Sequence, residues 1–154
     1  MPNTNTFFPT RELKIAFLLI VHGNPEQANL FIKQLLVYPE SYVYIHVDAK
    51  SVDIIPKLLN SPRVLIAPRH IDVRWGDYTQ IVVNNYMLRF AKGKQSHDYY
   101  SLHSGADLLI RPMSELVEHL RISRKYAYCH CSLLPNGWQY GGGRKTGIEM
   151  AEVF

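Results

Sequence analysis

Hydrophobic residues in this chain fall into short runs that alternate with amphipathic or polar segments. Leu13–Val21 is a nearly continuous apolar run (LKIAFLLIV), which predicts a strand buried on both faces of a parallel sheet. Beyond this run, apolar residues recur three and four positions apart, as in a helix that packs on a sheet. These residues are Ala28, Phe31, Ile32, Leu35 and Leu36. Asn24 and Pro25 suit the N-cap and the first position of this helix.

The same alternation continues along the chain. Further strands are predicted at Tyr42–Val47, Arg63–Ala67, Asp98–His103 and Tyr126–Cys131. Helices are predicted over 53–60, over 77–92 with Gly93 as the stop, and around 113–120, and a loop or short edge strand over 70–76. Because strands alternate with helices, we expect an α/β domain whose Rossmann-like, mostly parallel sheet is flanked by helices.

Three segments of different composition follow from this pattern. Residues 1–12 are mostly polar and are expected to form a flexible N-terminal arm. Residues 13–132 hold all the predicted strands and helices and form the expected α/β domain. Residues 133–154 include NGWQYGGGRKTG, with five glycines in twelve residues, and are expected to be irregular.

Composition narrows the class of protein further. The chain has 154 residues, of which 47% are hydrophobic and 19% charged, which excludes a mainly disordered chain. Two cysteines are too few for a disulfide framework. The first ten residues lack the basic start and apolar stretch of a secretory signal, so we expect a cytoplasmic protein. A net charge of +4 leaves an anionic small ligand, peripheral association with a membrane, and nucleic acid open.

Polar residues follow several of the predicted strands. His22, Asp48 and Asp107 come at or just after the ends of three strands. The carboxyl ends of parallel strands meet at one edge of a sheet, where ligands of open α/β sheets bind. A carboxylate there can hold ribose hydroxyls, and the indole of Trp75, in a loop on the same side, can stack on a base. The alternative is that Asp48 and Asp107 only cap turns.

Other candidate sites carry less weight. Cys129 and Cys131 lie two apart in a predicted strand with no second cysteine pair, so we expect no metal. The stretch from Gly141 to Thr146 lacks the spacing of a phosphate-binding loop, and no glycine-rich dinucleotide motif follows the first strand, so no cofactor is expected. Most tyrosines fall inside predicted strands, which argues against nucleic-acid binding.

Four segments, in order, resemble the core-2/I-branching glycosyltransferases, glycosyltransferase family 14, which includes protein xylosyltransferases. They are AFLLIVHGNPEQ (16–27), YPESYVYIHVDAKS (38–51), RVLIAPRHIDVRWGDYTQI (63–81) and HDYYSLHSGADLLIRPMSELVEHL (97–120). The shared pattern is a strand that ends in His, a tyrosine-rich strand with His-Val-Asp, then Trp-Gly, then Ser-Gly-x-Asp. The match runs over about residues 13 to 122.

The resemblance implies a nucleotide-sugar-binding fold of the glycosyltransferase A type. It implies transfer of N-acetylglucosamine, or less strongly xylose, from a UDP-sugar to a hydroxyl of a glycan or protein acceptor, with inversion and without a divalent metal. Carried over to this sequence, Asp48 would contact the uridine, and Val21 and Trp75 would line the base pocket. Asp107 would lie near the donor sugar and pyrophosphate, and His22 joins the candidate substrate-binding residues.

The resemblance also places the general base and the phosphate-neutralising cations downstream of the matched region, beyond Phe154. No catalytic residue is therefore assigned, Glu149 and Glu152 included, and Arg144 and Lys145 are as well explained by a solvated tail. The chain is expected to carry mainly the nucleotide-binding half of the enzyme. The alternative is a truncated, non-catalytic nucleotide-binding remnant. A half-finished sheet with an open edge also predicts self-association.

Overall fold

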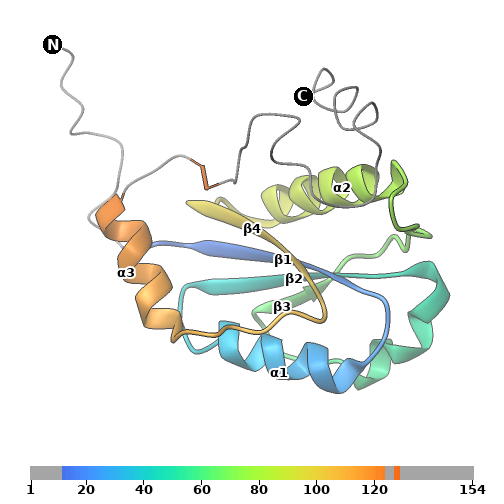
Figure 1. The fold of residues 1–154 in the computed structure, drawn as a ribbon, viewed down its shortest axis with the longest axis horizontal. Helices are drawn as coiled ribbons and strands as arrows, with labels where there is room; N and C mark the ends of the chain where they lie inside the picture. Colours follow the sequence, from blue (N-terminus) through green and yellow to red (C-terminus); the bar gives the residue numbers. More distant parts are fainter. Residues whose placement is uncertain (1–11, 124–126, 129–154) are drawn as a thin grey trace, which may run out of the picture. The chain divides into compact units, whose positions relative to one another are not determined.

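A parallel sheet of four strands forms the centre of the chain (Figure 1). The computed structural model describes residues 12–123 and 127–128, and within them the strand order is β3-β2-β1-β4. The strands are β1 (Ile15–Val21), β2 (Ser41–Val47), β3 (Val64–Ile66) and β4 (Tyr99–Ser104). All three pairings, β1 with β2, β1 with β4 and β2 with β3, are parallel. The predicted Rossmann-like α/β sheet is therefore confirmed.

Helices cover both faces of this sheet (Figure 1). One face packs against α1 (Pro25–Leu35), α3 (Met113–Ser123) and the 3-10 helix η1 (Ala49–Lys57), and the other packs against α2 (Thr79–Lys94). Alternate residues of β1 enter the two cores: Phe17 belongs to the first and Leu18 to the second, and neither is exposed to solvent. A strand with apolar neighbours on both sides needs an almost unbroken apolar run, which explains the pattern at 13–21.

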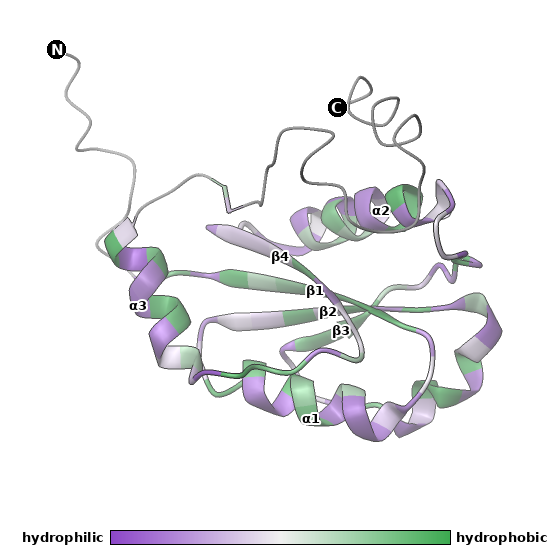
Figure 2. Ribbon diagram, viewed as in Figure 1, coloured by the Kyte–Doolittle hydropathy of each residue, from purple (hydrophilic) through white to green (hydrophobic). Residues whose placement is uncertain are grey.

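Helix α1 begins as its sequence predicts. The Asn24 side chain accepts a hydrogen bond of 3.1 Å from the backbone N–H of Gln27, and Pro25 takes the first helical position. All its apolar residues except Leu30, which is exposed, are buried, and Figure 2 shows the resulting alternation of hydrophobic and hydrophilic colour along α1.

Two predicted helices differ in detail from those observed. The helix expected over 53–60 is instead the 3-10 helix η1, which begins directly after Asp48 because the Asp48 side chain caps it by accepting from the Lys50 N–H. Gly93 does not stop α2, which continues to Lys94 before the backbone becomes extended at Gln95. Gly93 is exposed, so the helix tolerates it at a modest cost in conformational entropy.

Contacts between Cα positions divide the chain into two compact units, Met1–Arg124 and Lys125–Phe154. The strand predicted at Tyr126–Cys131 falls in the second unit, where only Ala127 and Tyr128 are described, and neither is in a strand. The predicted arm at 1–12 and the boundary after Ser132 also lie almost wholly outside the described residues. Among the helices that are described, none has the length and apolar character needed to cross a bilayer.

Candidate functional site

The strand order creates a natural binding position beside β1. From β1 the chain passes through α1 to β2 on one side, whereas α2 leads from β3 to β4 on the other side of β1. Connections that leave neighbouring strands in opposite directions open a crevice at the carboxyl ends of those strands, and ligands of α/β sheets bind there. A ligand is thus expected at the carboxyl ends of β1 and β4.

A crevice of about 350 Å³ lies at this position. Its walls come from the ends of β1 and β4, the loop before α2, and the first turns of α2. The lining residues are Ile20, His22, Val73, Gln80, Asn84, Leu102, His103, Ser104 and Asp107. They supply a carboxylate, a hydroxyl, two amides and two imidazoles, and none of them is Lys or Arg. This set of donors and acceptors suits the hydroxyl and carbonyl groups of an uncharged, polar ligand better than it suits a bare phosphate.

The turn that follows β4 brings Asp107 to the crevice. Ser104 donates its backbone N–H to Asp107 Oδ2 at 3.0 Å, and the Asp107 N–H donates to the Ser104 carbonyl at 3.2 Å. Gly105 donates to the Ile20 carbonyl at 2.8 Å, which fastens the turn to β1. A Cβ at Gly105 would lie only 2.7 Å from Val21 Cγ2. The glycine of the Ser-Gly-x-Asp motif is thus required because the turn presses on Val21.

A chain of hydrogen bonds leads from the same strand to Asp107. The Ser101 hydroxyl lies 2.7 Å from His103 Nε2, and His103 Nδ1 lies 3.3 Å from Asp107 Oδ2. Burial lowers the pKa of His103, and the hydrogen bond and charge of Asp107 offset part of this. The imidazole is therefore neutral at neutral pH, with its ring packed against Phe17 and Phe31.

Asp48 lies at the end of β2 and is fully buried. Its carboxylate accepts hydrogen bonds from the backbone N–H groups of Lys50 at 2.8 Å and Val73 at 3.1 Å, and from Lys50 Nζ. Burial alone would raise the pKa of this carboxyl, but the hydrogen bonds from Lys50 and Val73 outweigh it and hold the pKa below its usual value. Asp48 thus ties the loop before α2 to the end of the sheet, with His22 Nδ1 3.9 Å from its Oδ2.

A balanced group of charges extends from Asp48 toward solvent. Lys50 Nζ contacts Asp48, Asp72 and the Val73 carbonyl, the last at 3.0 Å. Arg74 lies 3.5 Å from the second oxygen of Asp72. Two cations therefore face two carboxylates beside Val73, which itself lines the crevice.

Trp75 lies on the outside of this loop with 94% of its surface exposed. The loop that carries it is nevertheless well held: Thr79 Oγ1 accepts from the Arg74 N–H at 2.9 Å, and Asp77 accepts from the Thr79 N–H at 2.9 Å. Gly76 adopts a left-handed φ of 71° that completes the turn. An indole presented on a rigid turn loses little conformational entropy when it binds a partner.

Of the residues predicted from the sequence, the crevice brings together His22 and Asp107. Val21 is buried and packs under the turn at Gly105, Asp48 is engaged with the loop, and Trp75 is exposed; these three do not line the crevice. Conversely, sequence reasoning missed some of the lining residues, chiefly Gln80, Asn84 and His103. The first two left a signal, because two amides four residues apart lie on the same face of a helix.

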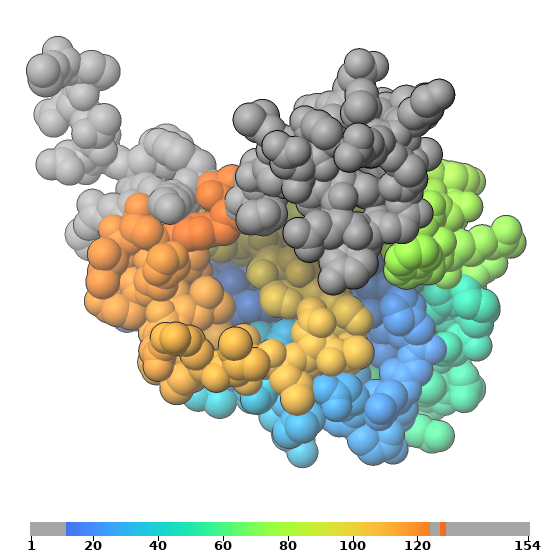
Figure 3. All heavy atoms as spheres, viewed as in Figure 1, coloured from blue at the N-terminus to red at the C-terminus, as the bar shows by residue number. Residues whose placement is uncertain are grey.

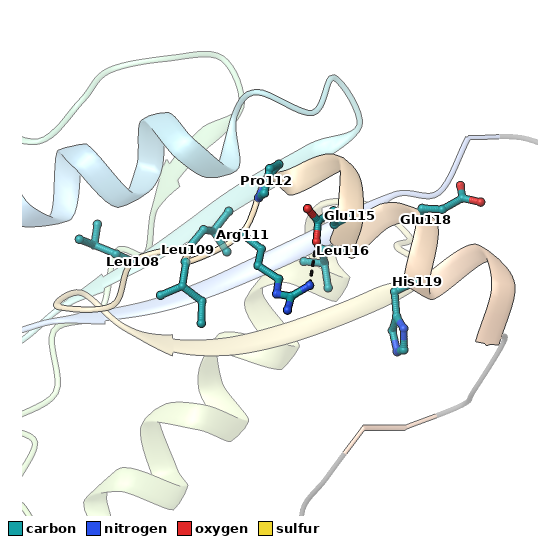
Figure 4. A pocket seen from close by; sticks show the side chains of 9 residues that line it. Leu108, Leu109, Arg111, Pro112, Glu115, Leu116, Glu118 and His119 are labelled. Atoms are coloured by element: carbon teal, nitrogen blue, oxygen red, sulfur yellow. Dashed lines mark hydrogen bonds and ion pairs between the residues drawn. The ribbon is translucent and has the colours of Figure 1, made fainter.

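A larger hollow, of about 620 Å³, lies beside α3 (Figure 4). It is lined by the segment Leu108–Pro112 and by residues of α3, and the ion pair of Arg111 with Glu115, at 3.2 Å, borders it. This segment, which follows β4, is exposed on the face shown in Figure 3, and Ile110 is 96% exposed. The hollow is away from the carboxyl ends of β1 and β4, and its polar groups are exposed. It is therefore a weaker candidate than the crevice.

Within the part of the chain that the structure describes, no three His, Cys, Asp or Glu side chains gather closely enough to hold a metal ion. The predicted strand with Cys129, His130 and Cys131 lies outside that part, as do Arg144, Lys145, Glu149 and Glu152. No model of a known protein family matches the chain, and a search of curated proteins finds no match.

Proposed function

We propose that the crevice between β1, β4 and α2 binds a UDP-sugar, and that the chain is the donor-binding half of an inverting glycosyltransferase. The donor sugar proposed first is N-acetylglucosamine, and xylose second. The observation that supports this most is the position of the crevice at the switch point of a parallel sheet, with hydrogen-bonding side chains and no cation in its lining. The ordered sequence resemblance to family 14 points to the same chemistry.

The size and lining of the crevice favour one part of such a donor. A volume of about 350 Å³ is near the lower end for ligand pockets, so the crevice accommodates a nucleoside or a sugar but not a whole nucleotide sugar. The carboxylate of Asp107 accepts from hydroxyl groups, and the amides of Gln80 and Asn84 both donate and accept. Ribose and pyranose hydroxyls are the groups that such a set recognises.

The diphosphate would then lie outside the crevice. The first N–H groups of α2 cannot hold it, because Thr79, Gln80 and Ile81 already donate to Asp77 and Tyr78. Two cations lie beside Val73, Lys50 in η1 and Arg74 in the loop before α2, and both are paired with Asp72. A phosphate would therefore compete with Asp72 for both, which predicts a modest contribution of the phosphates to affinity. Trp75 is free to stack on a base at the rim.

Inverting transfer needs a general base on the acceptor hydroxyl and stabilisation of the leaving diphosphate. We assign no residue of the crevice as that base, and the acceptor, a glycan or a protein, stays unassigned. The alternative, a non-catalytic nucleotide-binding protein, shares the binding step and differs only in the chemistry.

Calorimetric titration with UDP, UDP-N-acetylglucosamine and UDP-xylose tests the proposal, with ADP as the control for the base. We expect heat with the uridine nucleotides and a loss of about tenfold or more in affinity in Asp107→Asn, since a hydrogen bond to a charged group is removed. Trp75→Ser is expected to weaken binding of all three uridine nucleotides equally. Asp53→Asn, at an exposed site on η1, is the matched control.

Absence of heat with every uridine nucleotide would contradict the proposal. Heat without transfer to an acceptor or to water would favour the non-catalytic alternative. Addition of EDTA is expected to change neither binding nor turnover, and a strong loss would show that the proposed metal-independent chemistry is wrong.

A further inference from the structure

The carboxylate of Asp107 is held by only one of its two oxygens. Oδ2 accepts from the Ser104 backbone N–H at 3.0 Å and lies 3.3 Å from His103 Nδ1. Oδ1 receives no hydrogen bond from the described residues, although Asp107 lines the crevice with its side chain 48% exposed. One oxygen is thus used to orient the group, and the other is left for a ligand or water.

His103 is itself fixed in a single orientation and a single tautomer. A carboxylate can only accept, so the proton of the neutral ring is on Nδ1, where it donates to Asp107. Nε2 is then bare and accepts from the Ser101 hydroxyl at 2.7 Å. The rings of Phe17 and Phe31 pack against the imidazole with centroid distances of 5.8 and 5.2 Å. The Ser101 hydroxyl and the two aromatic rings therefore hold His103 so that its Nδ1–H points at Asp107 Oδ2.

The rest of the crevice indicates what the free oxygen meets. Its lining holds the amides of Gln80 and Asn84 and the Ser104 hydroxyl, and it holds no Lys or Arg to pair with a carboxylate. A ligand that is itself anionic would be repelled there. A carboxylate next to amides in a cavity without cations is complementary to neutral hydroxyl groups.

We infer that His103 is a positioning residue that aims Asp107 Oδ1 into the crevice as the acceptor for a hydroxyl of a neutral, polyhydroxylated ligand group. This inference deepens the proposed function and rests on it for the identity of the ligand, because ribose and N-acetylglucosamine both carry such groups. Ser101 acts one step further away, by holding the His103 ring in the orientation that points Nδ1 at Asp107. An acceptor that is already oriented before the ligand arrives improves affinity, because less conformational entropy is lost on binding.

The tautomer can be measured without any ligand. Long-range proton–nitrogen correlation spectra of the 15N-labelled full chain distinguish a neutral histidine protonated at Nδ1 from one protonated at Nε2. We expect His103 to be protonated at Nδ1 at pH 7.5, and to become a mixture of tautomers in Asp107→Asn. A His103 protonated at Nε2 in the unmodified protein, or one unaffected by Asp107→Asn, would overturn the inference.

Two substitutions at His103 separate positioning from packing. His103→Leu keeps the bulk against Phe17 and Phe31 but removes the donor, whereas His103→Asn keeps an N–H close to the position of Nδ1. With UDP-N-acetylglucosamine as the probe, we expect His103→Leu to weaken binding about five- to tenfold and His103→Asn to restore most of it, within about twofold of the unmodified protein. Equal losses in both variants would indicate a merely structural role and would overturn the inference.

Titrations with uridine and with N-acetylglucosamine, each alone, distinguish this inference from the proposed function. If N-acetylglucosamine perturbs the resonances of His103 and Asp107 while no uridine compound binds, the proposed function fails and the inference stands. If uridine perturbs them, both stand, and the ribose is the group recognised. If neither uridine nor N-acetylglucosamine perturbs His103 or Asp107, the crevice acceptor assigned to Asp107 is wrong.

Discussion

Asp48 Oδ2 accepts a hydrogen bond of 3.1 Å from the backbone N–H of Val73, a residue that lies 25 positions further along the chain. This contact connects the end of β2, on one side of β1, to the loop that carries Trp75 and forms one wall of the crevice. The carboxylate expected to meet uridine is thus already satisfied by the protein's own backbone. Asp48 thus holds in place the loop that forms one wall of the crevice.

Removal of this carboxylate is expected to destabilise the fold. Asp48→Ala leaves the N–H groups of Lys50 and Val73 without their partner in a buried site, and we expect a loss of about 3 kcal/mol in the free energy of unfolding. Urea unfolding measures this. Asp72→Ala, which removes an exposed partner of the same lysine, is the control and is expected to cost much less, because solvent screens an exposed ion pair. Equal losses of stability in the two variants would show that the buried hydrogen bonds of Asp48 do not stabilise the fold.

Gly105→Ala is expected to destabilise by about 2 kcal/mol, because the new methyl group would lie 2.7 Å from Val21 Cγ2 and overpack the turn. Gly93→Ala is the matched control. It has no atom within 4 Å of the added Cβ and lies inside α2, so it should be neutral or stabilising by up to about 1 kcal/mol. Gly105→Ala should cost less in a Val21→Ala background than in the unmodified protein, because the clashing methyl group of Val21 is gone. If the costs of the two substitutions simply add in the double variant, the two groups do not touch.

Stability should fall as the pH drops from about 6.5 to about 4, and His46 should be a main cause. Burial, followed by the nearby His70, lowers the pKa of His46 to about 4 from its ordinary value of 6.5. Between these values the unfolded chain binds a proton that the folded chain excludes, so stability is complete above this window and decreases as the pH falls through it. A shift of this size corresponds to a loss of about 3 kcal/mol at pH 4.

Urea unfolding at pH 7.5 and pH 4.5, with His46→Gln for comparison, measures this effect. The glutamine does not titrate and can still accept the Ile71 N–H, which in the native protein lies 2.8 Å from His46 Nε2. The variant should therefore lose less stability between the two pH values. His97 and His103, whose pKa values burial also lowers, contribute in the same direction and are unchanged in the variant. An unaltered pH dependence would show that His46 is not the group responsible.

Asp72→Asn is expected to strengthen UDP binding by about two- to fivefold at low salt, because it removes the carboxylate that competes with phosphate for Lys50 and Arg74. Calorimetry at about 20 mM salt, where screening is weak, and at about 300 mM salt, where it is strong, checks both the gain and its loss on screening. Asp53→Asn is again the control. A weaker affinity in Asp72→Asn would show that Asp72 orients these cations for the ligand.

The architecture followed from local patterns that need no knowledge of the rest of the molecule. The apolar run of β1 predicted a strand buried on both sides, and Asn24 with Pro25 predicted the start of α1, because periodicity and capping depend on neighbours in sequence. Helix ends were less well predicted. Gly93 continues α2, and the capping oxygen of Asp48 starts η1 four residues before the expected helix.

The candidate site was decided mainly by contacts between distant segments. His22 and Asp107 share the crevice because β4 pairs with β1, whereas Asp48, directly after β2, accepts from Val73. No local pattern states which strands are neighbours. The sequence therefore presented the ends of β1, β2 and β4 as equivalent, whereas in the structure the ends of β1 and β4 line the crevice and Asp48, after β2, holds the loop. The alternation of elements alone therefore determined a parallel α/β sheet, and only tertiary packing decided which polar side chains are buried, which are paired, and which are left for a ligand.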